Sequence, residues 1–207
     1  GTHDRIHPLR FDTQRRIPRL TAYKAKDQKV IFDRSYGYHT FTGQEPVEED
    51  DMFDMASNPI VCAALPVYME LYDQGKINLD TPISEYLPGL KFQKSNNKDV
   101  TLLSQLSHIA GFQPYYPFWS DAMKKGLTEQ AFQEIQRTED QNLWASKKIY
   151  DFVYKKIRDL PLTEANKMKY SCLGFVLAPR IIQNVTGENF HKYLKENVYD
   201  KLGAQYT

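Results

Sequence analysis

A short stretch around Ser57 constrains this chain more than any other. An acidic run from Glu48 to Asp51 precedes it, and an apolar run with helical spacing follows it and stops at Gly75. Serine is a good helix N-cap, and the first helical turn tolerates Pro59 because the missing N–H group has no intrahelical partner there. The pattern therefore predicts a helix that begins at Ser57.

Ser57 itself has two interpretations. As a capping residue it would only satisfy a free backbone N–H group, and the local pattern alone favours this. As a nucleophile it would use the helix dipole and the free N–H groups of the first turn, which favour developing negative charge. The rest of the chain has to decide between the two.

The N-terminal part of the chain changes character near residue 17. Residues 1–16 are rich in Arg and His and lack apolar periodicity, which indicates an arm, a linker or a remnant of cloning. Apolar and β-forming residues then alternate over residues 20–25 and 29–36, on either side of Lys26-Asp27-Gln28. This pattern predicts an antiparallel hairpin within residues 17–45.

Residues 46–207 are predicted to be mainly helical, with the elements separated by Pro and Gly. Pro66 should kink the first helix or weaken one of its hydrogen bonds. The aromatic, proline-bounded run from residue 114 to 119 is not expected to be regular helix, and it can wall a pocket. Two surface helices are expected between residues 127 and 160.

Composition narrows the partners. A formal net charge of +1 over 207 residues gives no field for nucleic acid or a membrane surface, and no apolar run approaches the roughly 20 residues of a membrane span. We expect no metal and no cofactor, because His39 has no partner at metal spacing and no glycine-rich phosphate loop is present. Cys62 and Cys172 are too few for a disulfide framework and are expected to be buried thiols.

Three stretches carry a resemblance to a known family. They are Asp54-Met55-Ala56-Ser57 with the run from Leu71 to Pro88, the run from Val100 to Phe112, and Lys169 to Gly187 with Tyr199 to Gly203. In this order they resemble the β-lactamase-related serine hydrolases, which include class C β-lactamases, penicillin-binding-protein-like peptidases and some esterases. The resemblance implies an α+β, partial β-lactamase/transpeptidase-like fold whose C-terminal sheet strands would lie beyond Thr207.

The same resemblance implies a site. In the family motif Ser-x-x-Lys, Ser57 takes the place of the nucleophile, and in the motif Tyr-Ser-Asn or Tyr-Ser-Asp, Tyr170 takes the place of the proton-transfer residue. The expected substrate-binding residues, two of them from the aromatic run, are Cys172, Ser171, Tyr115, Tyr116 and His108.

The chain departs from the family pattern at three sites. Ile60 stands where the motif has lysine, Ile109 and Ala110 replace two hydroxyl residues, and Cys172 replaces an amide or carboxylate. General-base help is worth about 10²–10⁴-fold, so the sequence predicts an impaired hydrolase that acts on an amide or ester through Ser57. Two alternatives stay open: a catalytically silent module that binds a cell-wall peptide or acyl ligand, and a half-domain that works only within a larger assembly.

The unpaired edge of the hairpin bears on assembly, because natural proteins rarely leave such an edge open. We therefore expect self-association or pairing with a companion C-terminal segment. The family resemblance favours a periplasmic or extracellular location.

Overall fold

A computed structural model of the chain describes residues 19–41, 43–92, 97–127 and 148–204. It divides into two compact units, Gly1–Asp54 and Met55–Thr207. The arm expected for residues 1–16 lies outside the described residues, as does most of the region for which two surface helices were expected.

The first unit contains the expected hairpin. Strands β1 (Arg19–Lys26) and β2 (Lys29–Gly37) pair antiparallel, with Arg19 opposite Gly37 and a bulge between Lys24 and Ala25. Asp27 and Gln28 form the turn with φ of 50° and 63°, and positive φ at both central residues gives the turn whose twist matches the strands. The hairpin prediction is confirmed, and β1 and β2 form the one sheet found in the described residues.

A loop after β2 folds back on the hairpin. Tyr38 bridges Pro46, and the Val47 N–H donates to the Gly37 carbonyl at 3.1 Å. His39 Nε2 lies 2.8 Å from Asp51 Oδ2, and the same carboxylate oxygen accepts the Glu48 N–H at 2.7 Å. His39 therefore serves to fix this acidic loop.

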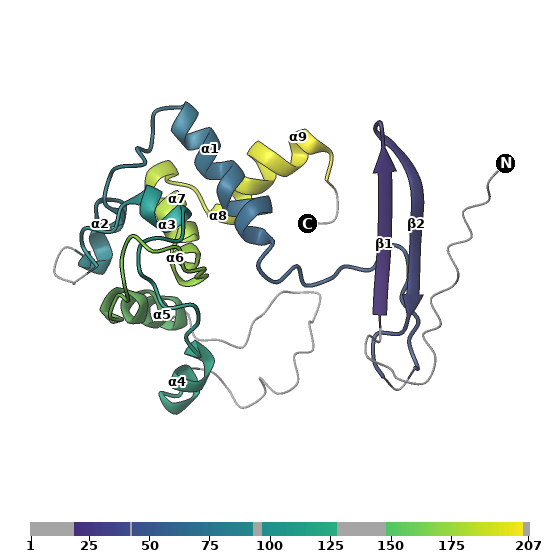
Figure 1. The fold of residues 1–207 in the computed structure, drawn as a ribbon, viewed down its shortest axis with the longest axis horizontal. Coiled ribbons are helices and arrows are strands. Elements are labelled where there is room, and N and C mark those ends of the chain that lie inside the picture. Colours follow the sequence, from purple (N-terminus) through teal and green to yellow (C-terminus); the bar gives the residue numbers. More distant parts are fainter. Residues whose placement is uncertain (1–18, 42, 93–96, 128–147, 205–207) are drawn as a thin grey trace. The chain divides into compact units, whose positions relative to one another are not determined.

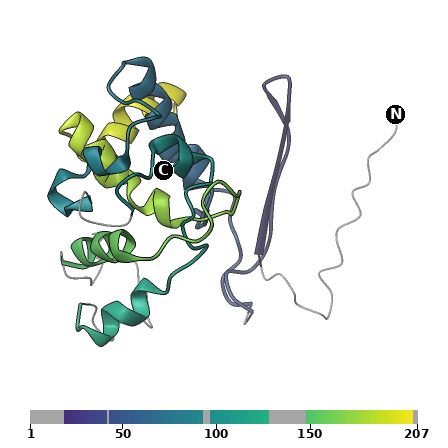
Figure 2. The same ribbon diagram turned by 60° about the vertical axis from the view of Figure 1, so that its left-hand side comes forward.

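The second unit is helical (Figures 1 and 2). Its elements are η1 (Ile60–Ala64, a π-helix), α1 (Leu65–Asp73), α2 (Ile83–Tyr86), η2 (Pro88–Leu90, a 3₁₀ turn), α3 (Leu102–Leu106), α4 (Phe118–Lys124), α5 (Lys148–Asp159), α6 (Leu173–Val176), α7 (Ala178–Thr186), α8 (Phe190–Leu194), η5 (Lys195–Tyr199, a π-helix) and α9 (Asp200–Leu202). The mainly helical character predicted for this part is confirmed.

Helix α1 carries the core of this unit. Val67, Tyr68 and Leu71 on one of its faces are at most 1% exposed. They share the core with a set of fully buried side chains from the later elements, namely Leu102, Ile157, Leu177, Ile181 and Ile182. The apolar periodicity of the sequence thus sets which face of α1 turns inward.

The prediction that Pro66 weakens a hydrogen bond of the first helix is confirmed. Pro66 stands in the first turn of α1 and follows the π-helical turn η1. Proline cannot donate a hydrogen bond to the carbonyl four residues back, which belongs to Cys62. The Tyr199 hydroxyl donates to that carbonyl at 3.2 Å, so the C-terminal part of the chain supplies the donor that Pro66 lacks.

One expectation about the aromatic run is wrong. Pro117 is the N-cap of α4, so Phe118 and Trp119 are helical. A proline at the start of a helix loses no hydrogen bond, so it marks where the helix begins and does not exclude one.

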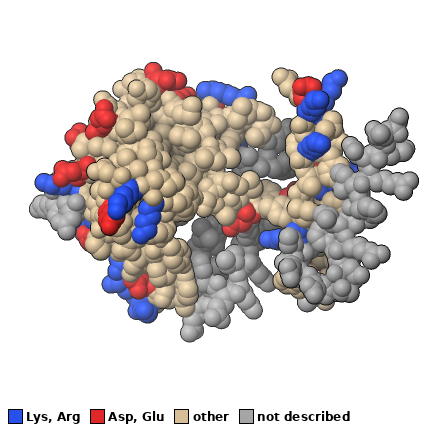
Figure 3. Space-filling model, in the orientation of Figure 1, with Lys and Arg blue, Asp and Glu red and all other residues tan. Residues whose placement is uncertain are grey.

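The surface charge of the helical unit is mixed on the face that Figure 3 shows. On the face seen in Figure 3, acidic and basic side chains of the helical unit are interspersed. Within the described ranges, none of the helices has both the length and the apolar character that crossing a membrane requires.

Candidate functional site

Ser57 lies in a turn ahead of the first helix. Pro59, not Ser57, occupies the N-cap position of η1, and no side chain caps that end. The residue before the serine, Ala56, has a φ of 49°, a conformation that non-glycine residues rarely adopt. The prediction that Ser57 begins and caps the helix is wrong, because its hydroxyl turns toward another segment instead.

That segment is the stretch that leads into α6. Ser57 Oγ lies 3.5 Å from Cys172 Sγ, and Cys172 Sγ lies 3.6 Å from the Tyr170 hydroxyl oxygen. We name these three residues the Ser57 cluster. Both contacts go through one sulfur, so the two hydroxyl oxygens lie inside the roughly 8 Å beyond which one water could not bridge them.

The Ser57 cluster is open to solvent. Ser57 is exposed, Tyr170 is 45% exposed and Cys172 is partly buried. Cys62 is exposed as well, so the expectation of two buried thiols is wrong. The family resemblance implied Cys172 as a site residue, and the tertiary fold brings it to the Ser57 turn across 115 positions.

Ile60 is a packing residue at the position where the family motif has lysine. Its side chain is partly buried and packs against the core of the helical unit. A branched hydrocarbon there can neither accept a proton nor carry charge. The first turn after Ser57 therefore contributes packing and no base.

His108 holds the Tyr170 segment in place. It has a φ of 57° at the turn after α3, its carbonyl accepts the Lys169 N–H at 2.9 Å, and its Nδ1 accepts the Ser171 N–H at 3.2 Å. Its ring lies 4.6 Å from the Tyr170 ring, centroid to centroid. These contacts make His108 a residue that positions Tyr170 and Ser171.

The Ser171 hydroxyl is used inside the fold. It donates to the Gln113 carbonyl at 2.6 Å and accepts the Leu173 N–H at 3.1 Å, and the residue is only 5% exposed. The second of these bonds lies at the start of α6. Ser171 therefore fixes the backbone next to Cys172, and its hydroxyl is occupied by two hydrogen bonds within the fold.

The two candidate tyrosines of the aromatic run lie apart from these contacts. Tyr116 donates to Asp121, and Lys156 Nζ lies 4.9 Å from the centre of its ring. The Tyr116 hydrogen bond, together with Lys156, holds the pKa of the Asp121 carboxyl below its usual value. Tyr115 is 67% exposed. The structure does not join either tyrosine to the Ser57 cluster.

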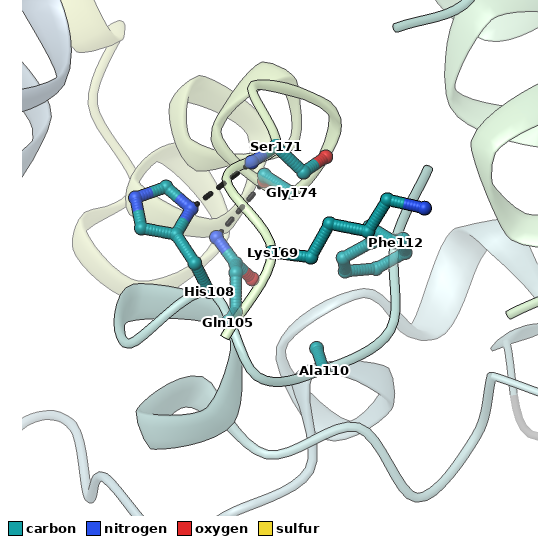
Figure 4. Close-up of a pocket in the computed structure, with 7 residues that line it drawn as sticks. All are labelled: Gln105, His108, Ala110, Phe112, Lys169, Ser171 and Gly174. Atoms are coloured by element: carbon teal, nitrogen blue, oxygen red, sulfur yellow. Dashed lines mark hydrogen bonds between the residues drawn. The ribbon is translucent and has the colours of Figure 1, made fainter. Parts of the chain in front are cut away.

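A small cavity is lined in part by Ser171, the residue between Tyr170 and Cys172 in the sequence (Figure 4). Its lining residues are Gln105, His108, Ala110, Phe112, Lys169, Ser171 and Gly174. The free space is about 10 Å³, which is about what one water molecule needs. Two predicted site residues, His108 and Ser171, therefore line this cavity.

Gln105 was not foreseen as a site residue. It is 2% exposed, its Nε2 donates to the Gly174 carbonyl at 2.9 Å, and its Oε1 has no hydrogen-bond partner in the described part of the chain. The signal in the sequence was a single glutamine inside the apolar run of α3. Its bond ties α3 to α6, the helix that begins directly after Cys172.

No group of three or more His, Cys, Asp or Glu residues in the described ranges is arranged to hold a metal ion.

Comparison with known proteins places these features in a family. The β-lactamase family model matches residues 9–207 of the chain. Curated relatives from Salmonella gallinarum and Salmonella enteritidis, both named "Putative D-alanyl-D-alanine carboxypeptidase", are 24% identical over 205 residues. The match covers 92% of this chain and 43% of each relative, so the chain spans less than half the length of these relatives.

Solved structures agree on the fold. An octameric penicillin-binding protein homologue from Pyrococcus abyssi superposes with a TM-score of 0.65 at 20% identity, over 91% of this chain and 40% of that one. A class C β-lactamase from Rhodobacter sphaeroides gives 0.58 at 20% identity, over 90% and 45%. The family model covers nearly the whole sequence and the neighbours share its fold, and on that evidence the chain belongs to the β-lactamase family.

Proposed function

We propose that the Ser57 cluster is an acyl-transfer site that takes an amide or ester ligand and uses Ser57 as a slow nucleophile. The observation that supports this is the meeting of Ser57 and Tyr170 through Cys172, with both contacts no longer than 3.6 Å. The name of the curated relatives, which refers to a peptide of D-alanine, is the reason to choose short peptide amides as the ligand class.

Ser57 and Tyr170 act on the ligand in this proposal, and two neighbouring residues position them. Ser57 Oγ would attack the carbonyl carbon of the ligand and accept its acyl group. Tyr170 is the group that could pass the proton to the leaving amine or alcohol, with its ring held against His108. His108 and Ser171 would position the segment through their backbone contacts.

Removal of the proton from the Ser57 hydroxyl is the step that makes this acyl transfer slow. Ile60 supplies no base, and the side chain in contact with Ser57 Oγ is a thiol. Loss of general-base help costs about 10²–10⁴-fold in rate, which is the reason to expect slow acyl transfer.

The test is labelling by a fluorophosphonate probe, which reacts with nucleophilic serines, followed by intact mass and peptide mapping. We expect Ser57 to be labelled over hours, not minutes, and the label to be lost in Ser57→Ala. Ser107→Ala removes another exposed serine, outside the cluster, and should label like the unmodified chain. Rapid stoichiometric labelling would mean that another group supplies the base, and the slow-nucleophile proposal would fail.

A silent binding module is the second candidate. The packing of Ile60 against the core favours it, because the residue at the position of the family's lysine stabilises the fold and provides no base. The same experiment separates the two candidates: absence of any Ser57 label after a day would support the silent module. Binding of a D-alanyl peptide measured by calorimetry would then be its remaining expected property.

A further inference from the structure

We propose that Cys172, and not Ser57, is the side chain of this site that activated acyl groups modify first. The proposal rests on the one above in a single respect, namely that acyl ligands reach the Ser57 cluster. It adds a thiol-dependent activity toward activated esters and thioesters, whose leaving groups depart without a proton.

Cys172 is not an isolated cysteine. Its sulfur lies between two hydroxyls that belong to separate parts of the chain, 3.5 Å from Ser57 Oγ and 3.6 Å from the Tyr170 oxygen. The two stretches involved are those that carry the family resemblance, and the family model covers both. The thiol therefore lies within the site that the family membership indicates.

The geometry lets one carbonyl carbon reach either nucleophile. Attack begins from separations of about 3–3.5 Å. Since the sulfur and the Ser57 oxygen are themselves 3.5 Å apart, one carbonyl carbon can lie within that distance of both atoms. Which atom takes the acyl group then depends on intrinsic reactivity.

Chemistry favours the sulfur. A serine hydroxyl needs a base to become a nucleophile, and Ile60 provides none. Thiols depend least on such help, because they carry a few per cent of the highly nucleophilic thiolate at pH 7. The hydroxyls of Ser57 and Tyr170 are within reach to donate hydrogen bonds to that thiolate or to the carbonyl oxygen of the ligand.

Acetyl transfer to Cys172 needs only the thiol and the activated ester. Cys172 loses its proton to solvent, and the thiolate sulfur attacks the carbonyl carbon of an activated ester such as p-nitrophenyl acetate. The new bond is S–C, the bond that breaks is the ester C–O bond, and the electron pair leaves with p-nitrophenolate. The product is an acetyl thioester on Cys172, with no change of oxidation state.

The experiment uses the full chain carrying Cys62→Ser, which removes the other, exposed thiol. After brief treatment with p-nitrophenyl acetate, intact mass should show one acetyl group, and peptide mapping should place it on Cys172. Neutral hydroxylamine should remove it, since it cleaves thioesters and leaves serine esters. In the same background, Cys172→Ser should lose about nine-tenths or more of the adduct, given the missing base at Ser57.

A second pair of variants tests the role of the neighbours. Ser57→Ala and Tyr170→Phe, each in the Cys62→Ser background, should slow acetylation of Cys172 about 2- to 10-fold, the worth of one hydrogen bond. Circular dichroism should show both variants folded. Cys172→Ala serves beside Cys172→Ser, so that a folding defect in one does not decide the outcome.

Two results would overturn the proposal. One is a hydroxylamine-resistant adduct on Ser57, and the other is a Cys172 that is not acetylated while Cys62 of the chain without substitutions is acetylated. The outcomes differ from those of the fluorophosphonate test. A silent Ser57 with an acetylated Cys172 would end the serine proposal alone, whereas a labelled Ser57 with an inert Cys172 would end only this one.

Discussion

One added methyl group at Gly174 should weaken the contact between α3 and α6. A Cβ at this position would lie 2.6 Å from Gln105 Cγ, 3.1 Å from its Cδ and 3.3 Å from Phe112 Cε2. The Gln105 side chain cannot move aside freely, because it is buried and its Nε2 is bonded to the Gly174 carbonyl. Gly174→Ala therefore forces either a clash or the loss of that bond.

The free energy follows from these two costs. Overpacking of a buried site costs about 1–3 kcal/mol, and a buried amide without its acceptor costs a similar amount. Replacing glycine by alanine in a helix returns at most about 1 kcal/mol. We expect Gly174→Ala to lower the free energy of unfolding by about 2 kcal/mol, and the melting temperature by about 4–8 °C.

Gly89 offers a matched control. It lies in η2, and a Cβ built on it meets nothing within 4 Å. Gly89→Ala should therefore be neutral or stabilise the chain by up to about 1 kcal/mol. Thermal and urea unfolding followed by circular dichroism measure both variants. If Gly174→Ala proved as stable as Gly89→Ala, the reasoning about the α3–α6 contact would be refuted.

Three further predictions concern the site, pH and assembly. Ile60→Lys should leave fluorophosphonate labelling of Ser57 within about tenfold of the unmodified chain and destabilise the fold, because a cation enters an apolar contact; a gain of 10² or more would contradict this. Asp121→Asn should lower the melting temperature at pH 7, and the difference should vanish in acid, because a carboxyl with a lowered pKa stabilises the fold only while ionised. If the difference in melting temperature grew as the pH fell, this explanation would be wrong. Light scattering over a range of concentrations should show self-association through the hairpin edges, which pair with no further strand among the described residues, and a monomer at every concentration would count against it.

The sequence by itself determined the local structure. Alternation of apolar residues around Asp27 and Gln28 predicted the hairpin, and helical spacing after Ser57 predicted the helical run that η1 and α1 form. The motifs around Ser57 and Tyr170 also pointed to the family that the comparisons show. These features depend on neighbours within a few residues, where turn preference and periodicity act directly.

The tertiary structure decided what the chemically important side chains do. The sequence favoured Ser57 as a cap, and only the approach of Cys172 across 115 positions explains why its hydroxyl turns elsewhere. Ser171 looked available for a ligand, yet its hydroxyl is occupied by two hydrogen bonds within the fold. Cys62 lost a backbone donor to Pro66, and Tyr199 replaces it from 137 positions away. Contacts over such separations depend on how the helices pack, and local propensities contain no information on which polar group will find which partner.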